Sequence, residues 1–332
     1  MEPKRVDRAI GAGAPSPEAA DRAAPHGGNM ILVAGATGRV GGLIARSLLE
    51  RQSETRVLVR RGSAYHPLAE AGADIALGDL KDPDSLAVAC RDVETIVTTA
   101  TAGERGGADT PQTVDVEGNR NLVEAARAAG VRQFVFVSTI AAAPDHPVPV
   151  PRAKAHAEAA LRESGLTYTI IAANAIMDVM FPLVIEYPLG QGRPVTLVGE
   201  GRRRHSFVAA RDVAAFTVAA VGHPEASNRR IIIGGPEALS WHDVISAYER
   251  ALGSPVRVEW IRAGELLPDL PPVPGLTALV SGLLAALETF DSAIDMTQTA
   301  RTFGVRPTTV DELLAGSRGP GAAGNSPRSI AG

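Results

Sequence analysis

One stretch near the start of the chain has the residue types and spacing to hold an anion. The apolar run 31–34 is followed by Gly35, Gly38 and Gly41, and then by an amphipathic run that ends near Glu50. Glycine permits a tight turn with positive φ at the first position, close approach of backbone N–H groups to a pyrophosphate at the second, and close helix–strand packing at the third. The helix N-terminus then faces the anion. The stretch predicts a dinucleotide cradle, and the same turn contributes Thr37, Arg39 and Val40.

The residues after the second expected strand, 56–60, distinguish two dinucleotides. NAD-binding versions of this fold have an acidic residue about 20 positions beyond the glycines, whereas a basic residue there accommodates the 2′-phosphate of NADP. This chain has Arg60 and Arg61 there and no carboxylate, and Arg39 in the glycine turn could reach the same phosphate. We therefore expect NADP(H) as the cofactor and no metal ligand. The alternative is that these arginines are only solvent-exposed side chains of a surface turn.

The elements around this cradle alternate between strands and helices. Further strands are expected at 73–79, 95–100, 133–139 and 167–171, and helices at 82–90, 118–129 and 152–164. This alternation predicts an α/β fold with a doubly wound parallel sheet, in which ligands bind beyond the carboxyl ends of the strands. Asp79 and Leu80 follow the third strand and are placed to meet the adenine. Cys90 lies in a helix, which favours packing over chemistry.

Four ranges describe the expected domain organisation. Residues 1–29 read as a disordered extension, with Met30 as a candidate natural start, and 316–332 as a disordered tail. Residues 30–175 form the dinucleotide-binding domain. Residues 176–315 form a smaller α/β substrate region interleaved with it, with strands at 195–198, 230–233 and 256–261 and helices at 211–221, 240–252 and 276–287. The last of these helices is apolar, and it is expected to be either a lid over the substrate or a dimer surface. Residues 202–205 are expected to be a solvated loop.

Composition excludes several classes of protein. The chain has 332 residues, a formal net charge of −4 and one cysteine. An acidic chain does not favour nucleic-acid binding, and a single cysteine excludes an internal disulfide and indicates a reducing compartment. No apolar run is long enough to cross a bilayer. We expect a cytoplasmic protein, a monomer or homodimer, with no nucleic-acid or membrane partner.

Several motifs together resemble those of the atypical short-chain dehydrogenase/reductases, in particular the NmrA-like family. They are Gly35-Ala-Thr-Gly38-Arg-Val-Gly41, Gly78-Asp79-Leu80, the run from Gly118 to Val131, Phe134 to Thr139, Lys154 with Glu158, Ser164 to Ile171, Phe207 to Asp212 and Ile233 to Ser240. The resemblance extends from about Met30 to Ala315. It implies a cofactor site that also includes Ala100, Thr101, Ser138, Lys154 and Asn174.

The resemblance also implies a catalytic site, and here the chain departs from the pattern. In the superfamily a tyrosine four residues before the lysine donates the proton, but this chain has Val150 at that position before Lys154. Ile140 stands where the usual serine falls, and Thr139 is the nearby hydroxyl. Catalysis would therefore depend on Lys154 and Thr139. The alternative for Lys154 is a solvated helix lysine paired with Glu158 at i,i+4.

The residues after the sixth strand predict the substrate class. Asn174 is expected at the nicotinamide carboxamide, and the side chains expected to line an apolar pocket, with core packing as the alternative for each, are Ile176, Met177, Met180 and Phe181. The sequence thus predicts an NADPH-dependent oxidoreductase that reduces a ketone or quinone on an apolar small molecule, polycyclic aromatic compounds included. The rival hypothesis is an NADP(H)-binding redox sensor without turnover.

Overall fold

A seven-stranded sheet forms the centre of the computed structural model, which describes residues 29–103, 107–268 and 270–316. Its strands are β1 (Ile31–Ala34), β2 (Thr55–Val59), β3 (Asp74–Leu77), β4 (Thr95–Thr98), β5 (Gln133–Thr139), β6 (Thr167–Ala173) and β8 (Arg229–Ile233). They are all parallel, in the order β3-β2-β1-β4-β5-β6-β8. The order reverses between β1 and β4, which confirms the doubly wound topology. Apart from Asn29 and Gly316, the terminal segments expected to be disordered lie outside the described residues.

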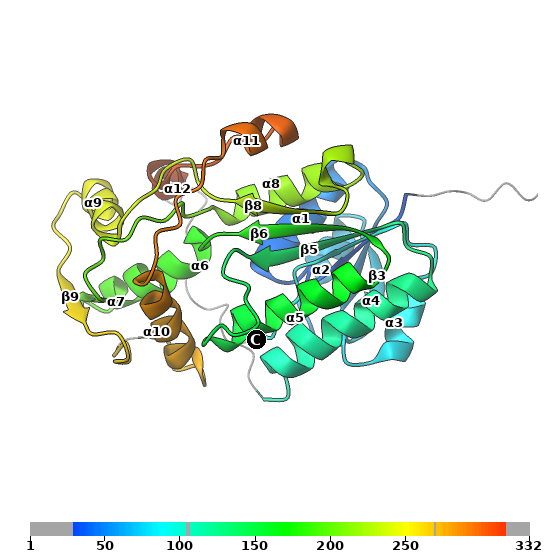
Figure 1. Cartoon of the computed structure of the whole chain (residues 1–332), viewed down its shortest axis with the longest axis horizontal. Helices are drawn as coiled ribbons and strands as arrows, with labels where there is room; N and C mark the ends of the chain where they lie inside the picture. Colours follow the sequence, from blue (N-terminus) through cyan, green and yellow to red (C-terminus); the bar gives the residue numbers. More distant parts are fainter. Residues whose placement is uncertain (1–28, 104–106, 269, 317–332) are drawn as a thin grey trace, which may run out of the picture.

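Helices cover both faces of this sheet (Figure 1). One face carries α1 (Arg39–Glu50), α2 (His66–Glu70) and α8 (Ala210–Ala220), and the other carries α3 (Pro83–Ala89), α4 (Asn119–Ala128) and α5 (Pro149–Glu163). Side chains of β5 alternate between the two cores: Val135 packs with the α1 side, and Phe134 and Phe136 pack with the α5 side. A strand buried on both faces reads as a continuous apolar run, as this one does.

Two helix starts lie where the sequence predicts them, each at a capping residue. The carboxylate of Asp82 caps α3 by accepting from the backbone N–H groups of Asp84 and Ser85. Ser240 and Asp243 form a capping box at the start of α9 (Trp241–Leu252). Cys90 ends α3 with its side chain fully buried in the core, as expected for a packing role, and burial raises the pKa of its thiol to about 11.

The helix expected from Gly118 is longer than the sequence predicts. A π-helical segment, η2 (Pro111–Gly118), precedes α4 and runs directly into it. Thr110 and Thr113 cap η2 reciprocally, and a proline occupies its first position. The wider π-helical turns disturb the 3.6-residue period, so this segment carries no regular apolar stripe in the sequence.

The remaining elements form a second apolar core beyond the carboxyl ends of β5 and β6 (left in Figure 1). They are α6 (Met177–Phe181), η3 (Pro182–Glu186), α7 (Tyr187–Gly190), β7 (Val195–Val198), α9, β9 (Val258–Ile261), α10 (Leu276–Leu287) and α12 (Val310–Gly316), with β7 and β9 forming a parallel pair. The chain leaves this region between β7 and α9, where α8, the short η4 (Pro224–Ala226) and β8 return to the main sheet, and again at α11 (Thr297–Phe303), which packs against α8. The two regions are thus interleaved in sequence.

One expectation about the second region is wrong. Arg202, Arg203 and Arg204 are exposed as expected of a solvated loop, but the side chain of His205 is fully buried. Its Nδ1 lies 2.7 Å from the hydroxyl of Ser292, and its backbone pairs with Leu239. The reason is that segments far apart in sequence converge here, which no local pattern reveals.

Within the described residues, none of the helices has the length and apolar character needed to cross a membrane.

Candidate dinucleotide site

A cleft with an empty volume of about 470 Å³ opens at the carboxyl ends of β1, β2, β3 and β4. It brings together Gly35, Thr37, Arg60, Asp79, Leu80 and Ala100, all of which the sequence predicts for cofactor binding. The cleft is also lined by Asp109 and Val114, which the sequence analysis missed. Residues from five separate segments therefore meet at one edge of the sheet, where the doubly wound fold binds ligands.

The glycine turn has the geometry of an anion cradle. Gly35 has φ +84°, and a Cβ added at Gly41 would lie 2.1 Å from the carbonyl oxygen of Gly35. The N–H of Gly38 donates to that same carbonyl at 3.0 Å and closes the turn. Helix α1 begins after Gly38 without a side-chain cap, so the N–H groups at Arg39 and Val40 have no partner within the helix. An uncapped helix start directly after Gly35 and Thr37, which line the cleft, fits the pyrophosphate of a dinucleotide.

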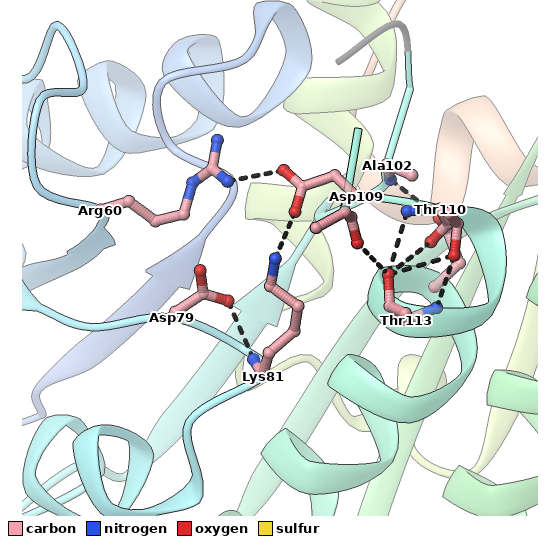
Figure 2. Close-up of polar contacts among 9 residues, drawn as sticks. Arg60, Asp79, Lys81, Ala102, Asp109, Thr110 and Thr113 are labelled. Atoms are coloured by element: carbon pink, nitrogen blue, oxygen red, sulfur yellow. Dashed lines mark hydrogen bonds and ion pairs between the residues drawn. The ribbon is translucent and has the colours of Figure 1, made fainter. Parts of the chain in front are cut away.

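Two cations and one carboxylate meet at the outer end of the cleft (Figure 2). Arg60 follows β2, Lys81 follows β3, and both donate to Asp109, at 2.6 Å and 2.5 Å. Burial acts to raise the pKa of Asp109, but the hydrogen bonds and charges of Lys81 and Arg60 together hold it below the ordinary value. Lys81 was not predicted, although it stands directly after Asp79-Leu80.

The turn after β3 is held in place by its own hydrogen bonds. The Oδ1 of Asp79 accepts from the N–H of Lys81 at 2.9 Å, and the carbonyl of Leu80 accepts from the side-chain amide of Asn121. A Cβ added at Gly118 would lie 2.9 Å from the Leu80 Cβ, so glycine at 118 lets η2 and α4 approach this turn closely. These contacts hold Asp79 and Leu80 in place at the position expected for the adenine.

A buried lysine lies beside Ala100, one of the residues that line the cleft. The Nζ of Lys154, on α5, donates to the carbonyl of Ala100 at 3.3 Å and lies 3.6 Å from the Oδ1 of Asp115. It also lies 4.9 Å from the centre of the Phe136 ring. The other oxygen of Asp115 accepts from the N–H of Ala102 at 2.8 Å. The alternative of a solvated lysine paired with Glu158 is excluded, since Lys154 is only 7% exposed.

Asp115 was missed by the sequence analysis, because its π-helical segment shows no regular apolar stripe. It is fully buried on η2, next to the apolar residue Val114. A buried carboxylate needs a charged partner or hydrogen bonds, which Lys154 and Ala102 supply here. The neighbouring hydroxyl of Thr101 is also buried and has no hydrogen-bond partner among the described residues.

The hydroxyls at the end of β5 have other partners. Ser138 donates to Glu158 at 2.6 Å, and Glu158 in turn accepts from Arg162 and Arg230. The Oγ1 of Thr139 accepts from the N–H of Ala141 at 3.3 Å and is only half-buried. Ser138 is thus part of an ion-pair network. The role of Thr139 in catalysis stays a prediction.

The residues expected at the nicotinamide and substrate lie deeper than anticipated. The amide nitrogen of Asn174 donates to the carbonyl and hydroxyl of Ser292, both at 3.0 Å, and its Oδ1 accepts from Ala175. Met177 and Phe181 are 0% exposed in the second core. The expectation that these two side chains line a pocket is therefore corrected: as the alternative held, they are core.

The other two predicted substrate residues differ from each other in exposure. Met180 is 6% exposed and packs in the same second core. Ile176 is half-buried, and its backbone forms a bridge with Val208. Of the four residues, Ile176 has the most side-chain surface left to meet a ligand.

The fold and this cleft together define a dinucleotide-binding protein of the Rossmann class. The chain belongs to the NmrA-like family, whose model matches residues 28–314. It is 33% identical over 231 residues to an NAD(P)H azoreductase of Xenophilus azovorans, an alignment that covers 69% of this chain and 76% of that protein. It is 32% identical over 230 residues to the photosystem II assembly factor Ycf39 of Cyanophora paradoxa, covering 69% and 70%.

Solved structures share the fold. An NADPH-dependent quinone oxidoreductase of Escherichia coli, crystallised with NADPH, superposes with a TM-score of 0.73 at 20% identity, covering 86% of this chain and 99% of that one. An isoflavone reductase superposes with a TM-score of 0.66 at 21% identity, covering 86% and 98%. These likenesses confirm the α/β architecture.

Proposed function

We propose that this protein is an NADPH-dependent oxidoreductase that reduces a ketone or quinone on an apolar small molecule. The observation that carries the proposal is the arrangement around the cleft: the glycine turn before an uncapped helix start, two cations on the carboxylate of Asp109, and a buried lysine that donates to Ala100. The relatives named as an azoreductase and a quinone oxidoreductase support it.

Each part of the cleft has a role in this proposal. The glycine turn and the first N–H groups of α1 bind the pyrophosphate, Arg60 and Lys81 bind the 2′-phosphate, and Asp79 and Leu80 bind the adenine. Bound NADPH supplies a hydride. Lys154, held by Ala100 and Asp115, provides positive charge next to the ribose and the reacting carbonyl.

The chemistry must proceed without the usual tyrosine. Val150, the second residue of α5, has an aliphatic side chain that cannot act as an acid. Lys154 is then the acid that α5 offers on the cleft side, and its ammonium also stabilises developing negative charge. A quinone suits this site, because its reduced oxygen is a weak base and needs little help from an acid.

A redox sensor without turnover is the second candidate function. It is favoured by Val150 and Ile140 in place of the usual catalytic residues, and by the deep burial of Met177 and Phe181. A sensor must bind NADPH and NADP⁺ with different affinities, because a ligand bound equally by two states shifts neither. Titration of the purified protein with each form of the cofactor separates the two functions.

We infer a reducing, cytoplasmic environment and a monomer or homodimer for this oxidoreductase. The buried single cysteine supports the first point, because it has no partner for a disulfide within the chain. Gel filtration with light scattering measures the second.

Oxidation of NADPH by the purified protein tests the proposal. Absorbance of the nicotinamide is followed with quinones, aromatic ketones and azo compounds as acceptors. The proposal expects turnover with at least one quinone or ketone. Tight NADPH binding with no turnover on any acceptor would contradict it and favour the sensor.

A further inference from the structure

The carboxylate of Asp109 stands where the proposed function needs room for a 2′-phosphate. Its side chain is 8% exposed, and its two oxygens accept from different cations, Oδ2 from Arg60 and Oδ1 from Lys81. Figure 2 shows the two cationic side chains converging on this one carboxylate from β2 and from the turn after β3. Each cation is partly exposed, at 39% for the side chain of Arg60 and 32% for that of Lys81, and Arg60 lines the cleft.

The backbone around Asp109 is held firmly on both sides. Thr110, the next residue, caps η2, and its hydroxyl accepts from the N–H of Thr113 at 3.1 Å. The hydroxyl of Thr113 donates to the carbonyl of Ala108, the preceding residue, at 2.8 Å. The carboxylate is therefore presented to Arg60 and Lys81 by a built turn, and its position does not depend on the two cations alone.

The charges of Asp109, Arg60 and Lys81 affect the binding of NADPH and of NADH differently. A phosphate carries about −1.5 to −2 charge at neutral pH and has three acceptor oxygens, so it outcompetes one carboxylate for two cations. It must nevertheless displace Asp109 and lie beside its negative charge. A ribose with free hydroxyls makes no such demand, because it leaves the ion pairs intact and its hydroxyls can donate to the carboxylate.

We propose that Asp109 is a specificity-determining residue. Its carboxylate pairs with Arg60 and Lys81 until the 2′-phosphate of NADPH displaces it. This competition makes the difference in affinity between NADPH and NADH smaller than it would be without Asp109. The inference rests on the proposed function, since it deepens the account of the same cofactor site. It makes NADH a usable cofactor and NADPH the better one, with Asp109 setting the difference.

The test measures binding of two fragments that differ only in the 2′-phosphate. Adenosine 2′,5′-bisphosphate and adenosine 5′-monophosphate are titrated by calorimetry into the wild type and the Asp109→Asn variant. We expect the variant to bind the bisphosphate about tenfold more tightly, as for a charge-assisted hydrogen bond released to a new partner, and the monophosphate within about twofold of the wild type. Asp92→Asn is the matched control, because Asp92 is exposed, precedes β4 at the amino ends of the strands, and has a φ of 59° that asparagine also adopts.

A double-mutant cycle guards against an indirect effect. In an Arg60→Gln background one of the two cations is gone, so Asp109→Asn should tighten the bisphosphate less than in the wild type. If Asp109→Asn leaves the ratio of the two affinities unchanged, or weakens the bisphosphate, the inference is wrong and Asp109 only positions the cations. If the wild type binds neither fragment, the proposed function itself fails, and this inference with it.

Discussion

Lys154 Nζ lies 3.6 Å from Asp115 Oδ1, and the two side chains are only 9% and 0% exposed. A buried ammonium and a buried carboxylate each require compensation that water cannot give here. The N–H of Ala102 donates to Oδ2 of Asp115 and the carbonyl of Ala100 accepts from Lys154, whereas Oδ1 of Asp115 has no hydrogen-bond partner among the described residues. The pair thus ties α5, η2 and the floor of the cleft together at the place where we propose that hydride transfer occurs.

Removal of one charge of this pair should lower the stability of the folded protein. We expect Asp115→Asn to lower the free energy of unfolding by about 3 kcal/mol, because it leaves the charge of Lys154 buried without its partner. The double variant Asp115→Leu with Lys154→Met should recover most of that loss, since it removes both charges. Urea unfolding followed by circular dichroism gives these values. Equal losses in the single and double variants would show that the pair contributes nothing as a pair.

Cofactor preference should depend on Arg60. We expect Arg60→Ala to weaken NADPH binding by about tenfold to a hundredfold and NADH binding by much less, because it removes charge-assisted hydrogen bonds to the 2′-phosphate. Arg51→Ala, at an exposed position just after α1, is the control and should change neither. Fluorescence titration measures both affinities. Equal losses for the two cofactors would refute a 2′-phosphate site at Arg60.

The close contact at Gly41 predicts a packing defect. An alanine Cβ there would lie 2.1 Å from the Gly35 carbonyl oxygen and 2.7 Å from the Thr99 hydroxyl, so α1 must move away from β1. We expect Gly41→Ala to cost about 1–3 kcal/mol of stability and to weaken dinucleotide binding. Gly190→Ala is the control, because a Cβ at that position meets nothing within 4 Å. Wild-type cofactor affinity in Gly41→Ala would be inconsistent with the cradle.

His205 should make stability depend on pH. Burial lowers its pKa below the ordinary 6.5, so the folded protein keeps the ring neutral at pH values where the unfolded chain takes up a proton. The contribution of the neutral ring is therefore complete above about pH 6.5 and is lost as the pH falls below that value, by up to about 1.4 kcal/mol per pH unit. Urea unfolding at pH 7.5 and 5.5 should show a larger loss for the wild type than for His205→Gln. Parallel behaviour of the two proteins would contradict this assignment.

Most of the fold was accessible from the sequence because its signals are local. Strands such as 133–139 and 195–198 are short apolar runs, and Asp82 and Ser240 mark helix starts by their own hydrogen bonds. The convergence of Gly35, Arg60 and Asp79 follows from topology alone, since parallel strands present their carboxyl ends at one edge.

The rest depends on contacts that no local pattern encodes. Asp109 meets Arg60 across 49 residues, and Asn174 meets Ser292 across 118. Asp115 lies in a π-helical segment that breaks the helical period. The apolar side chains of Met177 and Phe181 fit a core and a pocket equally well in sequence, and only packing distinguishes the two.

The central claim is that Lys154 acts on substrate in a cleft that binds NADPH. It is tested most directly by measuring NADPH affinity and single-turnover quinone reduction in the same preparations of wild type and of the Lys154→Met/Asp115→Leu variant, which keeps no unpaired buried charge. Arg152→Met, which removes a cation that donates to the His146 carbonyl, is the control. We predict that the double variant binds NADPH within about tenfold of the wild type but reduces quinone at least a hundredfold more slowly, as expected for loss of an acid or charge at the reacting centre. Unchanged reduction at saturating NADPH would contradict the account.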